Sequence, residues 1–285
     1  MTLFDPDLAP AMPAGTEAGT PAVEAGQTVR LRLVVAYSGA GFRGFAAQPG
    51  QRTVGGELAA AISKVVGDDV EMTCAGRTDA GVHAAGQVVH VDVRPGVDAV
   101  RLLRSVNAML GPAVVVREVA EAPSGFDARR SALARRYRYL VLEAATPDPL
   151  LAPMAWQVPG PLDLRAMVAG ADSLVGEHDF RAFCRRPPGS APGTPVPRRV
   201  LDARFRQLPV PAGELGEGAR LLRFDIEASS FCHQMVRSIV GVLVEVGRGR
   251  RRVADVTWLL RSGDRSRGGV IAPPHGLCLT AVQYP

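Results

Sequence analysis

The sequence predicts an α/β (α+β) protein made of two ferredoxin-like lobes whose antiparallel sheets join. Three observations support this fold class. The chain has 285 residues, enough to bury two moderate hydrophobic cores. The patterns of its first half follow the order β-α-β-β-α-β, which is that of a split βαβ unit. Its second half repeats this order loosely, without any repeat in the amino acids themselves.

The first lobe is predicted over residues 29–130. It follows a tail at 1–28 that is rich in Pro, Ala, Gly and Glu and is expected to be disordered. Apolar residues alternate with polar ones where strands are expected and recur at helical spacing where helices are expected. The predicted elements are a strand at 29–38, a helix at 54–67 with Thr53 as its N-cap, strands at 70–76 and 87–94, a helix at 98–110 and a strand at 113–119.

The second lobe is predicted over residues 131–285. A proline-rich stretch at 185–199 cannot form regular structure and is expected to be a mobile surface loop. The predicted elements are a strand at 135–144, a helix at 162–176 ended by Gly176, strands at 198–208 and 219–228, a long helix at 231–247, a short helix at 253–260 and a final strand at 277–285.

The charge of the chain favours a polyanionic partner without proving one. The net charge is +5, but residues 1–29 hold four acids and no basic residue, which leaves 33 basic against 24 acidic residues from Arg30 onward. Lys64 is the single lysine. A basic surface attracts RNA and speeds its encounter, although an arginine-rich composition can also follow from coding bias.

The compartment and the state of the cysteines follow from what the sequence lacks. No apolar run approaches the ~20 residues that span a bilayer, and the N-terminal residues do not resemble a secretory signal. We therefore expect a cytoplasmic protein without a membrane segment. The four cysteines form no CxxC pair and no zinc-ligand spacing, so we expect reduced, mostly buried thiols and no metal site: Cys74, Cys184, Cys232 and Cys278.

A GxGxxG pattern at residues 39–44 follows a predicted strand and could indicate dinucleotide binding. That fingerprint requires a helix to open within the glycine run, so that its first amides meet the pyrophosphate. Here Pro49 and Gly50 lie between the glycine run and the next predicted helix, which begins near Val54. We therefore interpret the pattern as a glycine-rich loop.

The segment CAGRTDAGVHAAGQVVHVD, which begins at Cys74, places one carboxylate in a tight turn between two strands. Asp79 is flanked by Gly76 and Gly81, which would let another chain approach closely. Its residues alone leave a second interpretation open, in which the carboxylate only accepts hydrogen bonds from backbone amides of the turn.

This segment resembles the signature of the tRNA pseudouridine synthase A family, GRTDAGVHA-x-GQV-x-H. The resemblance continues through FDARRSALARRYRYLV at 126–141, GEHDFRAF at 176–183, FCHQMVRSIVGVLVEVG at 231–247 and GLCLTAVQY at 276–284. It covers about residues 30–285. It implies the pseudouridine synthase fold, with two ferredoxin-like (RNP-like) lobes and a basic cleft between them.

The resemblance also implies the reaction and its partners. Family members break the uridine N1–C1′ bond, turn the base and rejoin it through C5, with an essential aspartate and no metal or other cofactor. The matching residue here is Asp79. The resemblance implies that it is the nucleophile, and it leaves open whether it attacks the base or the sugar. The implied substrate is the tRNA anticodon stem-loop at uridines 38, 39 and 40, bound by a homodimer.

Further site residues carry over by position. Arg237 lies in a predicted helix that is apolar nearly all round, where an unpaired charge would be costly. The family's matching arginine pairs with the aspartate, so we expect an Arg237–Asp79 ion pair that keeps the carboxylate ionised, with a structural ion pair elsewhere as the alternative. Tyr137 matches the family's active-site tyrosine and could stack on uracil, or it could be an ordinary core aromatic.

The remaining site residues concern RNA. Arg77 matches the arginine that displaces the target base, and such displacement costs a few kcal/mol of unstacking. We also assign Thr78, His83 and Gln87 to substrate binding, with His83 and His90 expected to position rather than to transfer protons. Arginine clusters are candidates for phosphate contacts at 129–138, 181–186, 198–199 and 248–252.

Some positions depart from the family pattern. The usual Gly-Trp-Gln is replaced after Gly44 by Phe45 and Ala46, and Gln234 stands where a second histidine is common. Asp127 and Arg130 also differ: the first replaces a frequent histidine and the second an aromatic residue. These departures concern RNA recognition and leave Asp79, Tyr137 and Arg237 unchanged. A catalytically silent RNA-binding protein of the same fold is the alternative function.

Overall fold

The computed structural model describes residues 28–185, 189–191, 193–210 and 215–285. The predicted tail therefore lies outside the described part, except for residue 28, as do positions 186–188 and 192 of the proline-rich loop. Among the described residues, no helix reaches the length and apolarity that a bilayer crossing requires.

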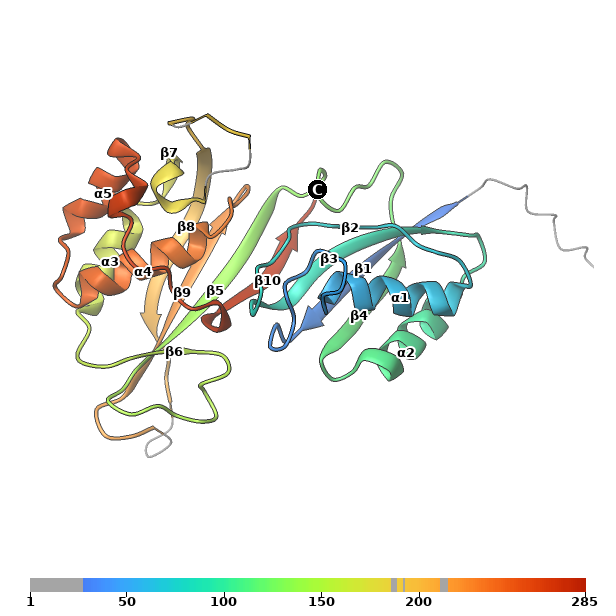
Figure 1. Cartoon of the computed structure of the whole chain (residues 1–285), viewed down its shortest axis with the longest axis horizontal. Coiled ribbons are helices and arrows are strands. Elements are labelled where there is room, and N and C mark those ends of the chain that lie inside the picture. Colours follow the sequence, from blue (N-terminus) through green and yellow to red (C-terminus); the bar gives the residue numbers. More distant parts are fainter. Residues whose placement is uncertain (1–27, 186–188, 192, 211–214) are drawn as a thin grey trace, which may run out of the picture.

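In the described part of the chain, ten strands form one mixed sheet in the order β4-β1-β3-β10-β5-β9-β8-β7, with β2 paired to β3 and β6 paired to β5 (Figure 1). The first half contributes four of them, and the predicted β-α-β-β-α-β order of that half is confirmed. The strands are β1 Val29–Tyr37, β2 Met72–Cys74, β3 His83–Val93, β4 Val114–Glu121, β5 Ala134–Glu143, β6 Trp156–Val158, β7 Gly176–Asp179, β8 Pro197–Gln207, β9 Arg220–Ala228 and β10 Leu277–Gln283.

The helices lie in two groups. In Figure 1, α1 and α2 lie together beside the N-terminal strands, and α3, α4 and α5 lie beside the C-terminal strands. Their bounds are α1 Val54–Val66, α2 Ala99–Leu110, α3 Leu164–Asp172, α4 Met235–Gly247 and α5 Val253–Ser262, with short 3-10 helices η1 Arg181–Phe183, η2 Arg265–Arg267 and η3 Pro274–Gly276.

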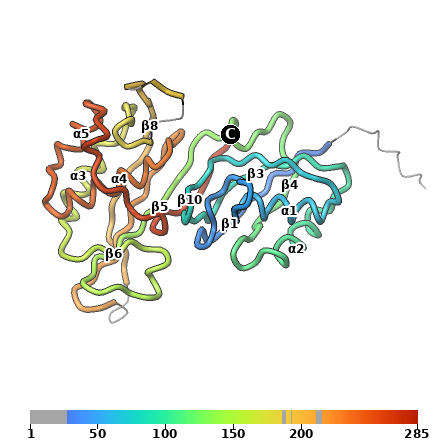
Figure 2. The backbone as a smooth tube through the Cα atoms, viewed as in Figure 1, coloured from blue at the N-terminus to red at the C-terminus, as the bar shows by residue number. Residues whose placement is uncertain are grey.

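The last strand joins the two halves of the sheet. β10 pairs with β5 antiparallel, but it pairs with β3 in parallel through Cys278↔His83 and Leu279↔Ala84. The expectation of joined antiparallel sheets is therefore wrong at this seam, and also at the parallel β5–β6 pair. The tube in Figure 2 shows the red C-terminal segment between the green β5 and the N-terminal strands.

Helix boundaries agree with the sequence where a capping residue is present. The Thr53 side chain accepts a hydrogen bond from the Gly56 amide at the start of α1, as predicted. The predicted helix 162–176 is shorter, because α3 ends at Asp172 and Gly176 opens β7 with φ +113. The predicted helix 231–247 begins only at Met235, because Gln234 has φ 66, in the left-handed region.

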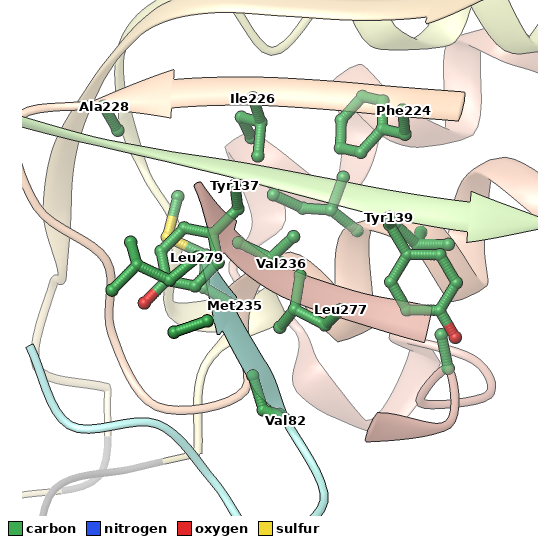
Figure 3. Close-up of a cluster of buried hydrophobic side chains, with 14 of the residues drawn as sticks. Val82, Tyr137, Tyr139, Phe224, Ile226, Ala228, Met235, Val236, Leu277 and Leu279 are labelled. Carbon is green, nitrogen blue, oxygen red and sulfur yellow. The ribbon is translucent and has the colours of Figure 1, made fainter. Parts of the chain in front are cut away.

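One continuous hydrophobic core spans both halves. It extends from Leu31 and Leu58 in the first half to Leu243 and Leu279 in the second. The division into lobes at residue 130 therefore stays a prediction. Most of α4 is buried, as its nearly uniform apolar character predicted. Figure 3 shows residues of β5, β9, β10 and the start of α4 packed together.

Candidate active site

Asp79 lies in the loop that joins β2 to β3. Contacts with the rest of the protein fix this loop on both sides of Asp79. On one side Val82 is buried, at 2% exposure, among the apolar residues of Figure 3. On the other side the Gln87 side-chain amide donates a 2.7 Å hydrogen bond to the carbonyl of Gly76. In the middle, the Thr78 hydroxyl lies 2.7 Å from the Tyr37 hydroxyl. The backbone that carries the carboxylate is thus fixed by neighbours inside the protein.

The glycine-rich segment at 39–44 packs against this same loop. The Phe45 amide donates to the Thr78 carbonyl at 3.1 Å. A Cβ on Gly44, where φ is +99, would lie 2.9 Å from that carbonyl, and a Cβ on Gly39 would lie 2.2 Å from the Val82 carbonyl. Gly39 and Gly44 are therefore needed because two backbones touch, and Gly41 has a positive φ of 77, so the three glycines have structural reasons that involve no nucleotide.

Two side chains from the second half of the chain lie next to the Asp79 carboxylate. Arg237 Nη1 donates to Oδ2 at 3.2 Å, which confirms the predicted contact. His233 Nε2 lies 3.3 Å from Oδ1. The side chain of Asp79 is 25% exposed, so the carboxylate is held and yet accessible from solvent. Arg237 is itself anchored by Nε, which donates to the Ala272 carbonyl at 2.7 Å.

The sequence did not identify His233 as a partner of Asp79. Its segment was expected to be helical, and one histidine in an apolar helix gives no signal of its own. The structure makes residues 232–234 a turn before α4, closed by a hydrogen bond from the Met235 amide to the Cys232 carbonyl. That turn directs the imidazole toward Asp79.

A disulfide joins Cys184, just after η1, to Cys232 in this turn. The expectation that all four cysteines are reduced is therefore wrong for these two, while Cys74 and Cys278 are free. Their Cα atoms are 5.8 Å apart. Sequence spacing could not reveal the pair, because 48 residues separate its members.

Tyr137 lies on β5 between Ile226 of β9 and Leu279 of β10. Its ring meets Phe231 edge to face at 5.1 Å, and the residue is 8% exposed. Burial, and then the nearby Tyr37 and Asp79, raise its pKa, so the phenol stays neutral at physiological pH. It belongs to the core and also lies near Asp79, so the two alternatives from the sequence are compatible.

The four other residues assigned to substrate differ in exposure. Arg77 is exposed, so it can reach a ligand directly. Thr78 and Gln87 are buried, at 7% and 0%. The Thr78 hydroxyl and the Gln87 side-chain nitrogen bond within the protein, whereas the Gln87 side-chain oxygen has no partner among the described residues. His83 links two segments, since Nδ1 accepts from the Gly39 amide and Nε2 lies 3.1 Å from the Pro153 carbonyl. These contacts support a role in holding the loop for the last three.

The predicted arginine clusters separate into paired and unpaired members. Arg135 is used internally, donating to the carbonyls of Ala75 and Ser229. Arg136 pairs with Glu227, and Arg251 with Glu245. Arg129, by contrast, is exposed, and its side chain bonds to no described residue. The charge balance alone could not distinguish these classes.

Comparison with known proteins gives a consistent match. A family model described as tRNA pseudouridine synthase matches residues 171–285, which include Arg237 and His233. A tRNA pseudouridine synthase A from Frankia casuarinae is 46% identical over 261 residues, which cover 90% of this chain and 90% of that protein. The chain belongs to the tRNA pseudouridine synthase family. As a member of this family it is an isomerase with the pseudouridine synthase fold.

Two further relatives agree with this family assignment. The tRNA pseudouridine synthase A of Cutibacterium acnes is 42% identical, and the alignment covers 90% of this chain and 89% of the relative. That of Leifsonia xyli subsp. xyli is 40% identical, with 91% and 93% covered. The matches span nearly the whole chain, so the family likeness is not confined to the C-terminal half that the family model matches.

Proposed function

We propose that the chain isomerises uridine to pseudouridine in the anticodon stem-loop of tRNA, at positions 38, 39 and 40, with Asp79 as the nucleophile. The observation that carries this proposal is the position of the Asp79 carboxylate between Arg237 and His233. The loop that carries it is fixed by contacts inside the protein, and the Asp79 side chain is still 25% exposed to solvent. Family membership supplies the reaction, and this geometry supports the role of the aspartate.

The isomerisation is balanced within the substrate. The N1–C1′ bond breaks, the base turns, C5 bonds to C1′, the hydrogen on C5 leaves as a proton and N1 gains one. Asp79 forms the transient covalent bond, to the base or to the sugar. No electrons are gained or lost overall, so the chemistry asks mainly for a positioned nucleophile and a held base.

The surrounding residues have separate tasks. Arg237 fixes the orientation of the Asp79 carboxylate and places a permanent positive charge 3.2 Å from it, because a guanidinium does not lose its charge under ordinary conditions. Tyr137 stacks its aromatic ring on the uracil. Arg77, exposed two residues before the nucleophile, displaces the target base and holds the RNA.

Three further statements belong to the proposal and rest on the resemblance and the sequence. The chain acts in the cytoplasm as a homodimer, with one tRNA contacting both subunits. Its two lobes, 29–130 and 131–285, enclose a basic cleft that contains Asp79. Size-exclusion chromatography with light scattering tests the dimer, and a monomer at micromolar concentration would contradict it.

The central experiment uses tRNA tritiated at uracil C5, because the rearrangement releases that hydrogen to water. Wild-type protein should release tritium, and Asp79→Asn should bind the tRNA without turnover. The binding of Asp79→Asn should weaken steeply with salt. Absence of release by the wild type would favour the alternative of a silent RNA-binding protein. Full release by Asp79→Asn would overturn the choice of nucleophile.

A further inference from the structure

Arg185 and Arg265 lie beside the active site, and neither has a carboxylate partner among the described residues. Arg265, in η2, donates from Nη2 to the Gln234 side-chain oxygen at 3.1 Å. Arg185 follows η1, is exposed, and donates its backbone amide to the His233 carbonyl at 3.0 Å. Both arginines therefore contact the turn 232–234, whose His233 touches Asp79.

The charge of these arginines is not balanced by the described part of the chain. The neighbouring acids are used elsewhere: Asp179 pairs with Arg181 at 3.2 Å, and Asp264 binds Ser266 and faces Arg267. Neither Arg185 nor Arg265 forms an ion pair with a described carboxylate. A partly buried guanidinium without an anion loses hydration, and another positive charge in its surroundings repels it. Burial, and then Arg185, lower the pKa of Arg265 accordingly.

Two unusual local features occur at the contact between Arg265 and Gln234. Nη1 of Arg265 is buried and has no hydrogen-bond partner among the described residues. Gln234 is the one described non-glycine residue with a positive φ, at 66°. Buried donors normally find an acceptor, and strained backbone concentrates at binding and catalytic sites. The unpaired Nη1 of Arg265 leaves room for an acceptor next to the turn, and an anion would suit the positive charge of the guanidinium.

We propose that Arg265, Arg185 and the turn 232–234 form a binding site for one phosphate of the RNA strand next to the target uridine. This inference rests on the proposed function, since it assumes that the uridine enters at Asp79. A phosphate supplies several acceptor oxygens, and guanidinium groups bind it with paired hydrogen bonds. Nη1 of Arg265 is buried in the free protein, so a phosphate reaches it only after neighbouring side chains move.

The site couples RNA binding to the nucleophile through one short segment. Gln234 holds Arg265, and the preceding His233 holds Asp79. A phosphate on the arginines would fix the strand at a set position relative to the carboxylate. The contact positions the substrate without touching the reacting atoms, so its loss should raise KM more than it lowers kcat.

The test is a linkage scan on an anticodon stem-loop RNA. One phosphate at a time near the target uridine is replaced by a neutral methylphosphonate, and Kd is measured for wild type, Arg265→Ala and Arg267→Ala. The Arg267→Ala control removes the same charge from the same 3-10 helix, where Arg267 is exposed and stacks on Trp258. At one linkage the wild type and the control should lose about tenfold in affinity, and Arg265→Ala should lose none.

The salt dependence of RNA affinity, measured also for a conservative variant, is the second test of the site. Arg265→Ala should flatten the slope of log K against log salt by about 0.7, the value for one contact to a single strand. Arg265→Lys should recover part of that slope, and it carries the test if Arg265→Ala does not fold. A wild type that is insensitive at every linkage, or an Arg265→Ala profile identical to the wild type, would overturn the site. Tritium release by the wild type is measured in parallel and reports on the proposed function alone.

Discussion

Arg237 lies 3.2 Å from the carboxylate of Asp79, although 158 residues separate them in sequence. The aspartate comes from a loop of the first half, and the arginine comes from the first turn of α4 in the second. Neither half holds a complete site by itself. Asp79 therefore gains its arginine partner only when the two halves of the chain pack together.

Replacing Arg237 should impair turnover more than RNA binding. The charged hydrogen bond to Asp79 is worth about 1.5–3 kcal/mol, so Arg237→Ala should lower kcat by about tenfold to a hundredfold. Arg237→Lys keeps the charge and should recover part of the loss. Single-turnover tritium release measures the rate, and filter binding measures Kd. Equal losses from both substitutions in binding alone would contradict this role.

The close contact at Gly44 gives a prediction with a matched control. Gly44→Ala would place a Cβ 2.9 Å from the Thr78 carbonyl, whereas a Cβ on Gly50 would meet nothing within 4 Å. Both glycines have positive φ, so each alanine costs about 1–2 kcal/mol of backbone strain. Gly44→Ala should cost more than Gly50→Ala in urea unfolding and should alone lower kcat. Identical effects would mean that the contact does not position Asp79.

The buried hydrogen bond between Tyr37 and Thr78 should be visible as coupling. Thr78→Val and Tyr37→Phe each remove one partner of a 2.7 Å bond inside the protein and should each cost about 1–3 kcal/mol. The double variant should cost less than the sum, by about 0.5 kcal/mol or more. Urea unfolding of all four proteins completes the cycle, and strict additivity would refute a direct bond.

Two histidines should make stability depend on pH near neutrality. Burial is the main cause that lowers the pKa of both His83 and His90 in the folded protein. The unfolded chain, with a histidine pKa of about 6.5, therefore binds protons first as pH falls. Stability should be fully present above about pH 6.5 and should decline below it.

The variant His83→Asn tests this assignment. Its side-chain oxygen can still accept from the Gly39 amide, which now donates to His83 Nδ1 at 3.1 Å, but it does not titrate. The decline of the unfolding free energy between about pH 6.5 and pH 5 should become shallower than in the wild type. An unchanged slope would assign the dependence to other groups.

The disulfide should be detectable chemically and thermodynamically. After denaturation without reductant, a thiol-alkylating reagent should label only Cys74 and Cys278, and after reduction it should label all four cysteines. The bridge closes a loop of 48 residues, which corresponds to about 4 kcal/mol in the chain-entropy model. Cys184→Ser removes the bridge and should therefore lower the free energy of unfolding. Four labelled thiols without reductant would contradict the bridge.

Much of the fold was predictable because the local signals agreed. Alternating strands, a Thr53 cap and a nearly all-apolar α4 each have a short-range cause. The parallel contact of β10 with β3 was not predictable, since the pairing rests on which edges remain free once both halves have formed. The sequence likewise could not show that Gln234 adopts a positive φ, because no glycine marks that turn.

The site was predictable where a long motif covered it and unpredictable where it depended on neighbours. Asp79 and Arg237 followed from the resemblance, and their contact is present. His233 was overlooked, because its approach to Asp79 depends on a turn that helical periodicity conceals. Gln87 was assigned to substrate, yet its 0% exposure results from packing that no single segment encodes.

The position of β10 in the sheet bears on the order in which the protein folds during synthesis. Every other described element leaves the ribosome before Leu277–Gln283, and domains generally fold from the N-terminus as they emerge. The strands of the first half can pair early, but the seam between β3 and β5 stays open until this last strand arrives. A nascent chain can therefore display the loop that carries Asp79 before Arg237 is fixed beside it. Competence to modify RNA would then begin only once β10 has been synthesised and has paired with both β3 and β5.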